Sequence, residues 1–149
     1  MNKLYKIFGY LGALPFIIFA GLTFVQQSVF EQGVVAIIGA AQFFYGAMII
    51  NFLSGIHWVN AFKTQNKIRL SLAMLPTIMC LILGAIFLES LSPILPLAIM
   101  AAMFALMYLV DKRYHSQDDW PEGYLSFRLR ITSIVTVTLL IHAGYLYVL

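Results

Sequence analysis

Five long apolar stretches dominate this sequence, at about residues 4–25, 34–62, 70–88, 93–110 and 129–149. A helix needs about 20 largely apolar residues to cross the hydrocarbon core of a bilayer. Each unpaired backbone group in lipid costs several kcal/mol, and a helix pairs its own backbone groups. The sequence therefore predicts an all-α integral membrane bundle of five transmembrane helices, folded as a single domain over residues 1–149.

The composition supports this class of fold. Apolar residues make up 62% of the 149 residues and charged residues only 10%, whereas a soluble protein carries roughly 25% charged residues. These proportions exclude a cytosolic enzyme and a disordered chain. The net charge of +3 comes from basic residues beside the apolar stretches rather than from one patch. We therefore expect the lipid bilayer, and no nucleic acid, as a partner.

The distribution of basic residues predicts the orientation of the bundle. All nine Lys and Arg residues lie on one side of the predicted membrane: Lys3, Lys6, Lys63, Lys67, Arg69, Lys112, Arg113, Arg128 and Arg130. The charges on the other side are Glu31 and Glu89. By the positive-inside rule, the N-terminus is predicted inside and the C-terminus outside. No Ala-x-Ala cleavage pattern follows the first stretch, so we predict a retained helix rather than a signal peptide.

The second stretch is unusually rich in polar and small residues. They are Gln42, Tyr45, Asn51, Ser54, His57 and Trp58, with Gly39, Gly46 and Gly55 among them. At 100° per residue most of them share one broad side, opposite Phe52 and Val59. Small residues allow close approach of helices, and amides hydrogen-bond across them. We therefore expect this side to face protein and the second helix to lie at the centre of the bundle.

Two interpretations of this polar side remain open. Packing between helices is the common use of such residues and is the one we favour. The alternative is a site for a polar headgroup, a quinone or a proton, because ionisable groups inside a membrane are functional candidates by default. His57 is the best candidate for such a site, since its ordinary pKa lies near 6.5.

Arg128 and Arg130 begin the fifth stretch and point about 200° apart on a helix. Both cannot face the same surroundings. The favoured interpretation is that both anchor the helix at the membrane surface. The alternative is a guanidinium that faces the bundle near His57 and Asn51 and clamps an anion or headgroup. The candidate binding residues are thus Asn51, Ser54, His57, Trp58, Arg128 and Arg130.

The remaining reactive side chains are scattered. Cys80 is the single cysteine, and His57, His115 and His142 lie on different elements, with His57 and His142 towards opposite ends of the membrane. A metal site needs several ligands at close spacing. We therefore expect no metal, no cofactor and no catalytic residues.

The connection between the fourth and fifth stretches contains two polar segments. Residues 111–113, Asp-Lys-Arg, are predicted to form a solvated boundary at the end of the fourth helix. Residues 116–123 are rich in turn formers and are predicted to rest on the membrane interface.

Several segments resemble, in the same order, a domain-of-unknown-function family of small bacterial inner-membrane proteins, which also includes the mitochondrial transmembrane protein sixty-nine. The most specific are Phe-Leu-Ser-Gly-Ile-His-Trp at 52–58 and Tyr-Leu-x-x-Arg-Leu-Arg-x-Thr at 124–132. Many relatives are expected to carry a second glycine where Ser54 stands. The resemblance implies a helical inner-membrane protein without an established activity. Its motif positions here are Ser54, Gly55, His57, Trp58, Arg128 and Arg130.

These observations favour a non-enzymatic accessory or scaffold protein of the bacterial inner membrane. Its helix faces would contact lipid, a partner membrane protein or a second copy of the chain. The alternative is a small carrier or channel for a proton, quinone or lipid headgroup, lined by the polar face of the second helix with His57, Asn51 and Arg128.

Overall fold

The computed structural model describes residues 2–26 and 32–148, so the predicted position of Glu31 lies outside the described residues. The described elements are α1 (Lys3–Gln26), α2 (Gln32–Thr64), α3 (Lys67–Ser90), α4 (Ile94–Tyr114), the short 3-10 helix η1 (His115–Gln117) and α5 (Tyr124–Val148). Among them, α1 to α5 are long and apolar enough to cross a membrane. The prediction of an all-α, five-helix membrane bundle is confirmed, and the protein is a multi-pass membrane protein.

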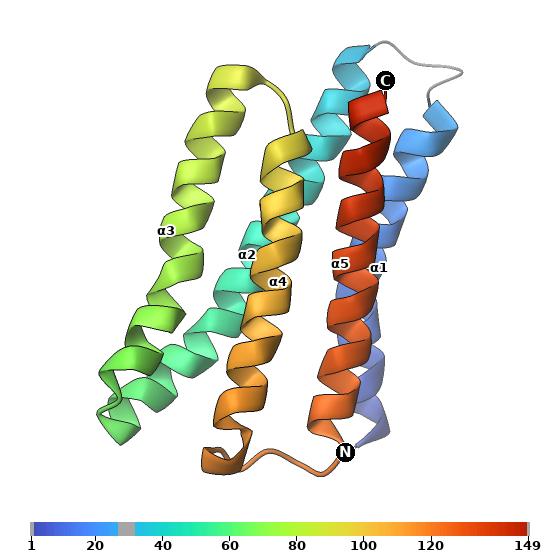
Figure 1. The fold of residues 1–149 in the computed structure, drawn as a ribbon. Coiled ribbons are helices and arrows are strands. Elements are labelled where there is room, and N and C mark those ends of the chain that lie inside the picture. The colour runs from blue at the N-terminus through green and yellow to red at the C-terminus, as the bar shows by residue number, and fades with distance from the viewer. Residues whose placement is uncertain (1, 27–31, 149) are drawn as a thin grey trace.

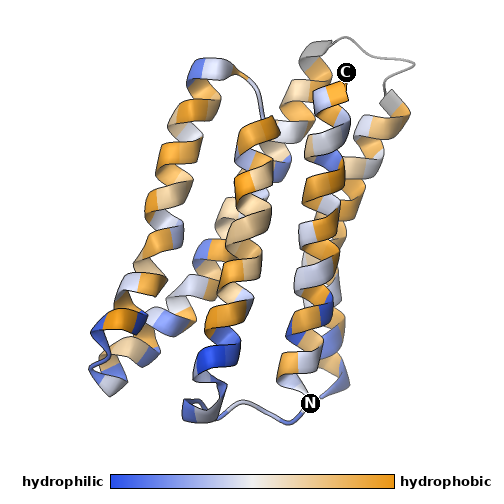
Figure 2. Cartoon of the chain, in the orientation of Figure 1, coloured by the Kyte–Doolittle hydropathy of each residue, from blue (hydrophilic) through white to orange (hydrophobic). Residues whose placement is uncertain are grey.

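Consecutive helices run in opposite directions, so the N-terminus and the C-terminus lie at opposite ends of the bundle (Figure 1). The middle of each helix is apolar, and the most hydrophilic residues gather at the end that holds the N-terminus (Figure 2). We call this end the N-terminal end of the bundle. It contains the connections from α2 to α3 and from α4 to α5.

The most buried helix is α4 rather than α2. Half of the central residues of α4 are buried, against at most 28% in each of the other helices. The helix packs against α5 along most of its length and also touches α2 and α3. The sequence expectation that α2 occupies the centre is therefore wrong. The outer face of α2 is exposed, as at Phe52 and Trp58, because no other helix covers it.

The ends of α4 and α5 differ from the predicted spans. Helix α4 continues past residue 110 to Tyr114, and α5 begins at Tyr124 rather than at 129. The predicted spans stop where apolar residues stop. The helices continue because Asp111 and Arg128 are buried and bonded to each other, so neither has to leave the protein interior for water.

A tight turn joins α2 to α3. Gln65 adopts a left-handed backbone conformation with φ of 53°, and the side chain of Asn66 accepts a hydrogen bond from the backbone N–H of Arg69 at 2.9 Å. This is the N-cap that satisfies a free N–H group of the first helical turn. The cap fixes where α3 starts and therefore which residue of its first turn faces the bundle.

Candidate functional site

Five ionisable side chains form a buried group at the N-terminal end of the bundle. They are His57 on α2, Arg69 on α3, Asp111 on α4, Asp118 just after η1, and Arg128 on α5. We call this group the ionic cluster. Arg69 and His57 are at most 1% exposed, and Arg128 is 6% exposed. Charged residues are almost never buried to this extent unless they are paired.

Arg69 and Asp118 form the first ion pair of the cluster. The guanidinium donates from Nη1 to Oδ1 at 2.8 Å and from Nη2 to Oδ2 at 2.5 Å, the two-bond geometry that makes Arg–carboxylate contacts strong. The same guanidinium lies over the ring of Tyr114, 4.6 Å from its centre. Trp120 Nε1 donates to Asp118 at 3.1 Å. These contacts fold the segment after η1 back onto α3.

Asp111 is the centre of the second ion pair. Its carboxylate accepts hydrogen bonds from Arg128 Nε at 2.7 Å and from His57 Nε2 at 3.0 Å. The Tyr124 hydroxyl is a third, longer donor at 3.4 Å. One carboxylate thereby joins α4 to both α2 and α5.

His57 connects the two ion pairs. Arg69 Nη2 lies 3.0 Å from His57 Nδ1, and a guanidinium can only donate hydrogen bonds. His57 Nδ1 must therefore be the unprotonated, accepting nitrogen, and Nε2 carries the proton that it donates to Asp111. In this tautomer His57 is neutral. The two guanidiniums and the two carboxylates then balance each other's charge.

The electrostatic balance is visible at Asp118, which lies outside the membrane-spanning helices. Burial alone would raise the pKa of this carboxyl. The hydrogen bonds and the positive charge of Arg69 outweigh burial, with a further hydrogen bond from Trp120, so the pKa of Asp118 is lowered from its ordinary value. Asp118 is thus held as a carboxylate.

The helical repeat explains how these charges reach the interior. The buried residues of α5 recur every three or four positions: Arg128, Thr132, Val135, Leu139 and His142. On α4 the same spacing links Met100, Phe104, Met107, Asp111 and Tyr114. Residues at this spacing lie on one face of a helix. Asp111 and Arg128 therefore belong to the core stripes of their helices, near the N-terminal end of the bundle.

The structure brings together two of the predicted binding residues. His57 and Arg128 meet through Asp111. Arg128 points into the bundle whereas Arg130 is exposed, so the favoured interpretation that both arginines are surface anchors is wrong for Arg128. Packing against α4 sets the rotation of α5, and this rotation turns residue 128 inward.

The other predicted residues lie apart from the ionic cluster. Ser54 donates to the backbone carbonyl of Ala73, and Asn51 accepts from Thr77 at 2.5 Å, so both join α2 to α3. Trp58 is exposed and packs edge-on against Phe62, with ring centres 4.6 Å apart. Of the alternative clamp of Arg128 with His57 and Asn51, Asn51 therefore lies elsewhere, while His57 is linked to Arg128 through Asp111.

Three members of the cluster are absent from the predicted binding residues. The sequence pattern identifies Arg69 only as a basic residue on one side of the membrane, and it predicts a solvated boundary at residues 111–113, which is wrong for Asp111 because that residue is 4% exposed. Asp118 falls within the turn-rich segment that is predicted to rest on the interface. A signal for Asp111 and Arg69 was present, since each continues the three-to-four spacing of the apolar residues in its helix. No local pattern marks Asp118.

A second buried polar group lies in the half of the bundle away from the ionic cluster. His142 Nε2 is 2.8 Å from the Thr23 hydroxyl, and His142 Nδ1 contacts the side-chain oxygen of Gln42. All three side chains are fully buried, and they join α1, α2 and α5. The predicted separation of His57 and His142 towards opposite ends is confirmed. Within residues 2–26 and 32–148 no group of three or more His, Cys, Asp or Glu gathers as a metal site would require.

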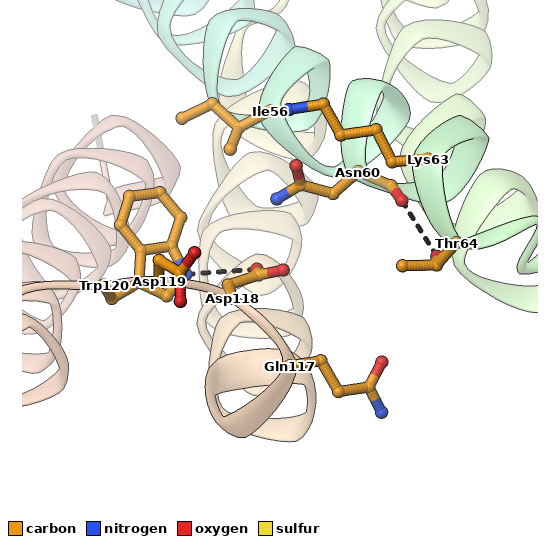
Figure 3. A pocket seen from close by; sticks show the side chains of 8 residues that line it. All are labelled: Ile56, Asn60, Lys63, Thr64, Gln117, Asp118, Asp119 and Trp120. Carbon is orange, nitrogen blue, oxygen red and sulfur yellow. Dashed lines mark hydrogen bonds between the residues drawn. The ribbon is translucent and has the colours of Figure 1, made fainter.

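Two cavities flank the ionic cluster. A polar cavity of about 350 Å³ lies between the end of α2 and the segment after η1. Its walls include Asn60 and Lys63 on one side and Asp118, Asp119 and Trp120 on the other, and the Trp120–Asp118 hydrogen bond closes one edge (Figure 3). An apolar cavity of about 280 Å³ lies on the other side of Arg128, among α1, α2, α4 and α5.

Comparison with known proteins places the chain in one family. The comparison with curated proteins gave no match, and the comparison with solved structures gave none either. A family model described as "Protein of unknown function (DUF3429)" matches residues 1–144, which is nearly the whole sequence. The chain belongs to this family of unknown function, as its sequence motifs predicted.

Proposed function

We propose that this protein is a non-enzymatic accessory or scaffold protein of the bacterial inner membrane, with its N-terminal end in the cytoplasm. The observation that carries the proposal is the ionic cluster. Each charged group in it is bonded to a group of opposite charge, and together they fasten α2, α3, α4, α5 and the segment after η1. Such a group holds a shape in place rather than presenting a free reactive side chain.

Burial makes the loss of any one of these charged partners costly in free energy. Removing one partner of a buried ion pair leaves a charge in a poorly polar interior, which costs about 3–5 kcal/mol. The N-terminal end of the bundle is therefore expected to be rigid, and a rigid end suits a protein that is recognised by lipid or by a partner.

Exposed basic residues surround this rigid end. Lys63, Lys67, Lys112, Arg113 and Arg130 are all exposed. A basic residue near an anionic leaflet contributes about 1 kcal/mol of attraction. This arrangement supports a cytoplasmic location for the N-terminal end and lipid headgroups as one contact surface.

A groove between α2 and α3 supports a partner helix as the second contact. It has a volume of about 450 Å³ and is lined by Asn51, Thr77, Cys80 and Gly84 among apolar residues. Thr77 is exposed, so its hydroxyl and the Asn51 amide face the position of lipid. Polar side chains in membranes usually mark contacts between helices. A helix of a partner protein would cover this pair.

The test is isolation of the protein from native membranes directly into lipid nanodiscs, followed by mass spectrometry of what is retained. We expect one partner polypeptide at a fixed ratio. Gly84→Leu fills the groove and should release the partner. Gly144→Leu is the matched control, because a Cβ atom at Gly144 meets no other atom within 4 Å and the residue does not line the groove.

Cys80 separates two kinds of partner. It is a free cysteine and lines the groove. If a second copy of the chain covers the groove, oxidation of native membranes should link two copies through Cys80. A different partner protein gives no such dimer while it still accompanies the purified protein.

The carrier alternative predicts a different result. A path for protons needs a continuous series of polar groups across the bundle. Here both nitrogens of His57 are engaged in the ionic cluster, and Asn51 is bonded to Thr77 on the α2–α3 side. We expect proteoliposomes to show no more proton flux than protein-free liposomes. Flux that disappears in His57→Ala would contradict the scaffold proposal and favour a carrier.

A further inference from the structure

The apolar cavity beside Arg128 has the features of a ligand site. Seven aromatic rings line it: Phe8, Phe16, Phe52, Phe104, Trp120, Tyr124 and Phe127. Its rim includes Phe8 and Phe52, which are 62% and 72% exposed. The helices that carry these two residues, α1 and α2, diverge towards the N-terminal end (Figure 1). The exposed Phe8 and Phe52 therefore place this edge of the cavity at the lipid-facing surface of α1 and α2.

Two residues of the cavity wall each carry a fully buried hydrogen-bond donor that has no protein partner. Arg128 Nη2 and Thr132 Oγ1 are buried and bond to no group among the described residues. Both residues line the cavity, and they are four positions apart, so they lie on the same face of α5. A buried donor left unpaired destabilises the protein. A ligand with an acceptor between these two donors would remove that destabilisation.

The charge of the ionic cluster restricts the ligand. Arg128 is already paired with Asp111, and the two arginines and two aspartates balance. An anionic ligand would add an uncompensated buried charge, which is expensive. A carbonyl oxygen accepts hydrogen bonds without adding charge. The most suitable acceptor is therefore an uncharged carbonyl.

The size and walls of the cavity restrict the ligand further. An apolar cavity of about 150 Å³ holds a benzene molecule, so about 280 Å³ suits a substituted six-membered ring. Aromatic walls favour a flat ring through stacked and edge-on contacts. The edge of the cavity at the lipid-facing surface of α1 and α2 allows an apolar tail to continue into the bilayer.

We propose that this cavity binds an uncharged carbonyl-bearing ring with an apolar tail, the chemistry of a membrane quinone, with Arg128 and Thr132 donating to one ring carbonyl. The proposal goes beyond the accessory role and does not depend on it, because occupancy of the cavity can be measured on the purified protein alone.

Thr132→Val is the most informative variant. Valine keeps the branched shape but removes the unpaired hydroxyl, so the empty protein should be as stable as the wild type or more stable. Binding should weaken by about 5–10-fold, because one hydrogen bond to the ligand is lost. Thr136→Val is the matched control: its hydroxyl is also buried without a partner, but Thr136 does not line the cavity.

Gly12→Leu tests the space itself. A Cβ atom at Gly12 meets no other atom within 4 Å, and Gly12 lines the cavity. The start of a leucine side chain is therefore accommodated, and its outer carbons should take up part of the ligand position. Gly21→Leu is the control on the same helix, since Gly21 has equal room and is not part of the cavity wall.

The fluorescence of Trp120 serves as the reporter of binding. The chain contains two tryptophans, and Trp58→Phe leaves Trp120 in the cavity wall as the single one. The Trp58→Phe protein and its further variants are placed in nanodiscs of uncharged saturated phospholipid. Decylubiquinone is added first, and the quenching of Trp120 fluorescence is recorded. Decylbenzene or the ester lipid monoolein is then added, and any reversal of the quenching shows that it displaces the quinone.

We expect decylubiquinone to quench Trp120 saturably. Its apparent affinity should be weaker in Thr132→Val, and saturable quenching should be absent in Gly12→Leu. In both control variants the affinity should stay within twofold of that of the Trp58→Phe protein. Decylbenzene, which lacks the carbonyl, should not displace the quinone. Equal affinities of Thr132→Val and Thr136→Val, or quenching that rises linearly without saturation, would overturn the proposal. Displacement by monoolein at the same or lower concentration would also overturn it and indicate a lipid ester site.

Discussion

Asp111→Asn should be the most damaging conservative substitution in this protein. The Asp111 carboxylate accepts from Arg128, His57 and Tyr124 and is 4% exposed. Asparagine has nearly the same shape but no charge, and its amide nitrogen would face a donor. Arg128 would then be buried without a counter-charge, and breaking a buried pair in this way costs about 3–5 kcal/mol. We expect a loss of that size in the free energy of unfolding.

The assay is reversible unfolding of the purified protein in mixed micelles of mild detergent and SDS. Asp119→Asn is the control, because Asp119 is exposed in the same polar connection, and its effect should stay within about 0.5 kcal/mol. In the double variant Asp111→Asn, Arg128→Met, the unpaired charge is gone, so the loss should be smaller than the sum of the single losses by at least about 1 kcal/mol. A loss below about 1 kcal/mol in Asp111→Asn, or strictly additive effects, would refute the assignment of a coupled buried ion pair.

Three further predictions concern neighbouring contacts. Arg69→Lys keeps the charge but loses the two-bond contact with Asp118 and the bond to His57, so the unfolding assay should show a loss of about 2 kcal/mol, whereas exposed Arg113→Lys should show almost none. The pKa of Asp118 is lowered in the folded protein. Its stabilising contribution is therefore present above the unfolded-state pKa of about 3.9 and is lost as the pH falls through the lower folded-state pKa. Between about pH 6 and pH 3, the free energy of unfolding should depend less on pH in Asp118→Asn than in the wild type. Thr23→Val removes the hydroxyl that contacts His142 between α1 and α5 and should cost about 1 kcal/mol, while Thr138→Val, which loses a bond within α5 alone, should cost less than half as much.

The fold could be predicted because membrane insertion depends on hydropathy averaged over a whole helix. A single Asn51 or His57 hardly changes the mean hydropathy of α2, so all five helices are evident from the sequence. The same averaging explains the errors at the helix ends. It treats Asp111 and Arg128 as the points where the chain leaves the membrane, although each is one more residue on a buried stripe.

The candidate site was only half predictable for a related reason. The angle between Arg128 and Arg130 shows that the two cannot face the same surroundings, and the spacing from Arg128 through Thr132 and Val135 indicates which of them continues the buried face. The identity of its partner depends on the position of α4 along α5, and no pattern within one helix gives that position. Asp118 is harder still, because it reaches Arg69 from a connection without a helical repeat.

Arg128 belongs to both the ionic cluster and the apolar cavity, and this shared position links the two. Its Nε is bonded to Asp111, its Nη2 is buried without a partner, and the residue lines the cavity. A ligand on Nη2 would hold the guanidinium in the orientation that Asp111 requires, and Asp111 in turn keeps the guanidinium in position for the ligand. Binding that favours one arrangement stabilises it, by an amount that grows with the logarithm of the ligand concentration relative to Kd. Occupancy of the cavity should therefore stabilise the contacts among α2, α4 and α5. Loss of Asp111 should weaken binding, although Asp111 itself does not contact the ligand. A rigid N-terminal end and a ligand in the cavity would then be two consequences of one buried arginine.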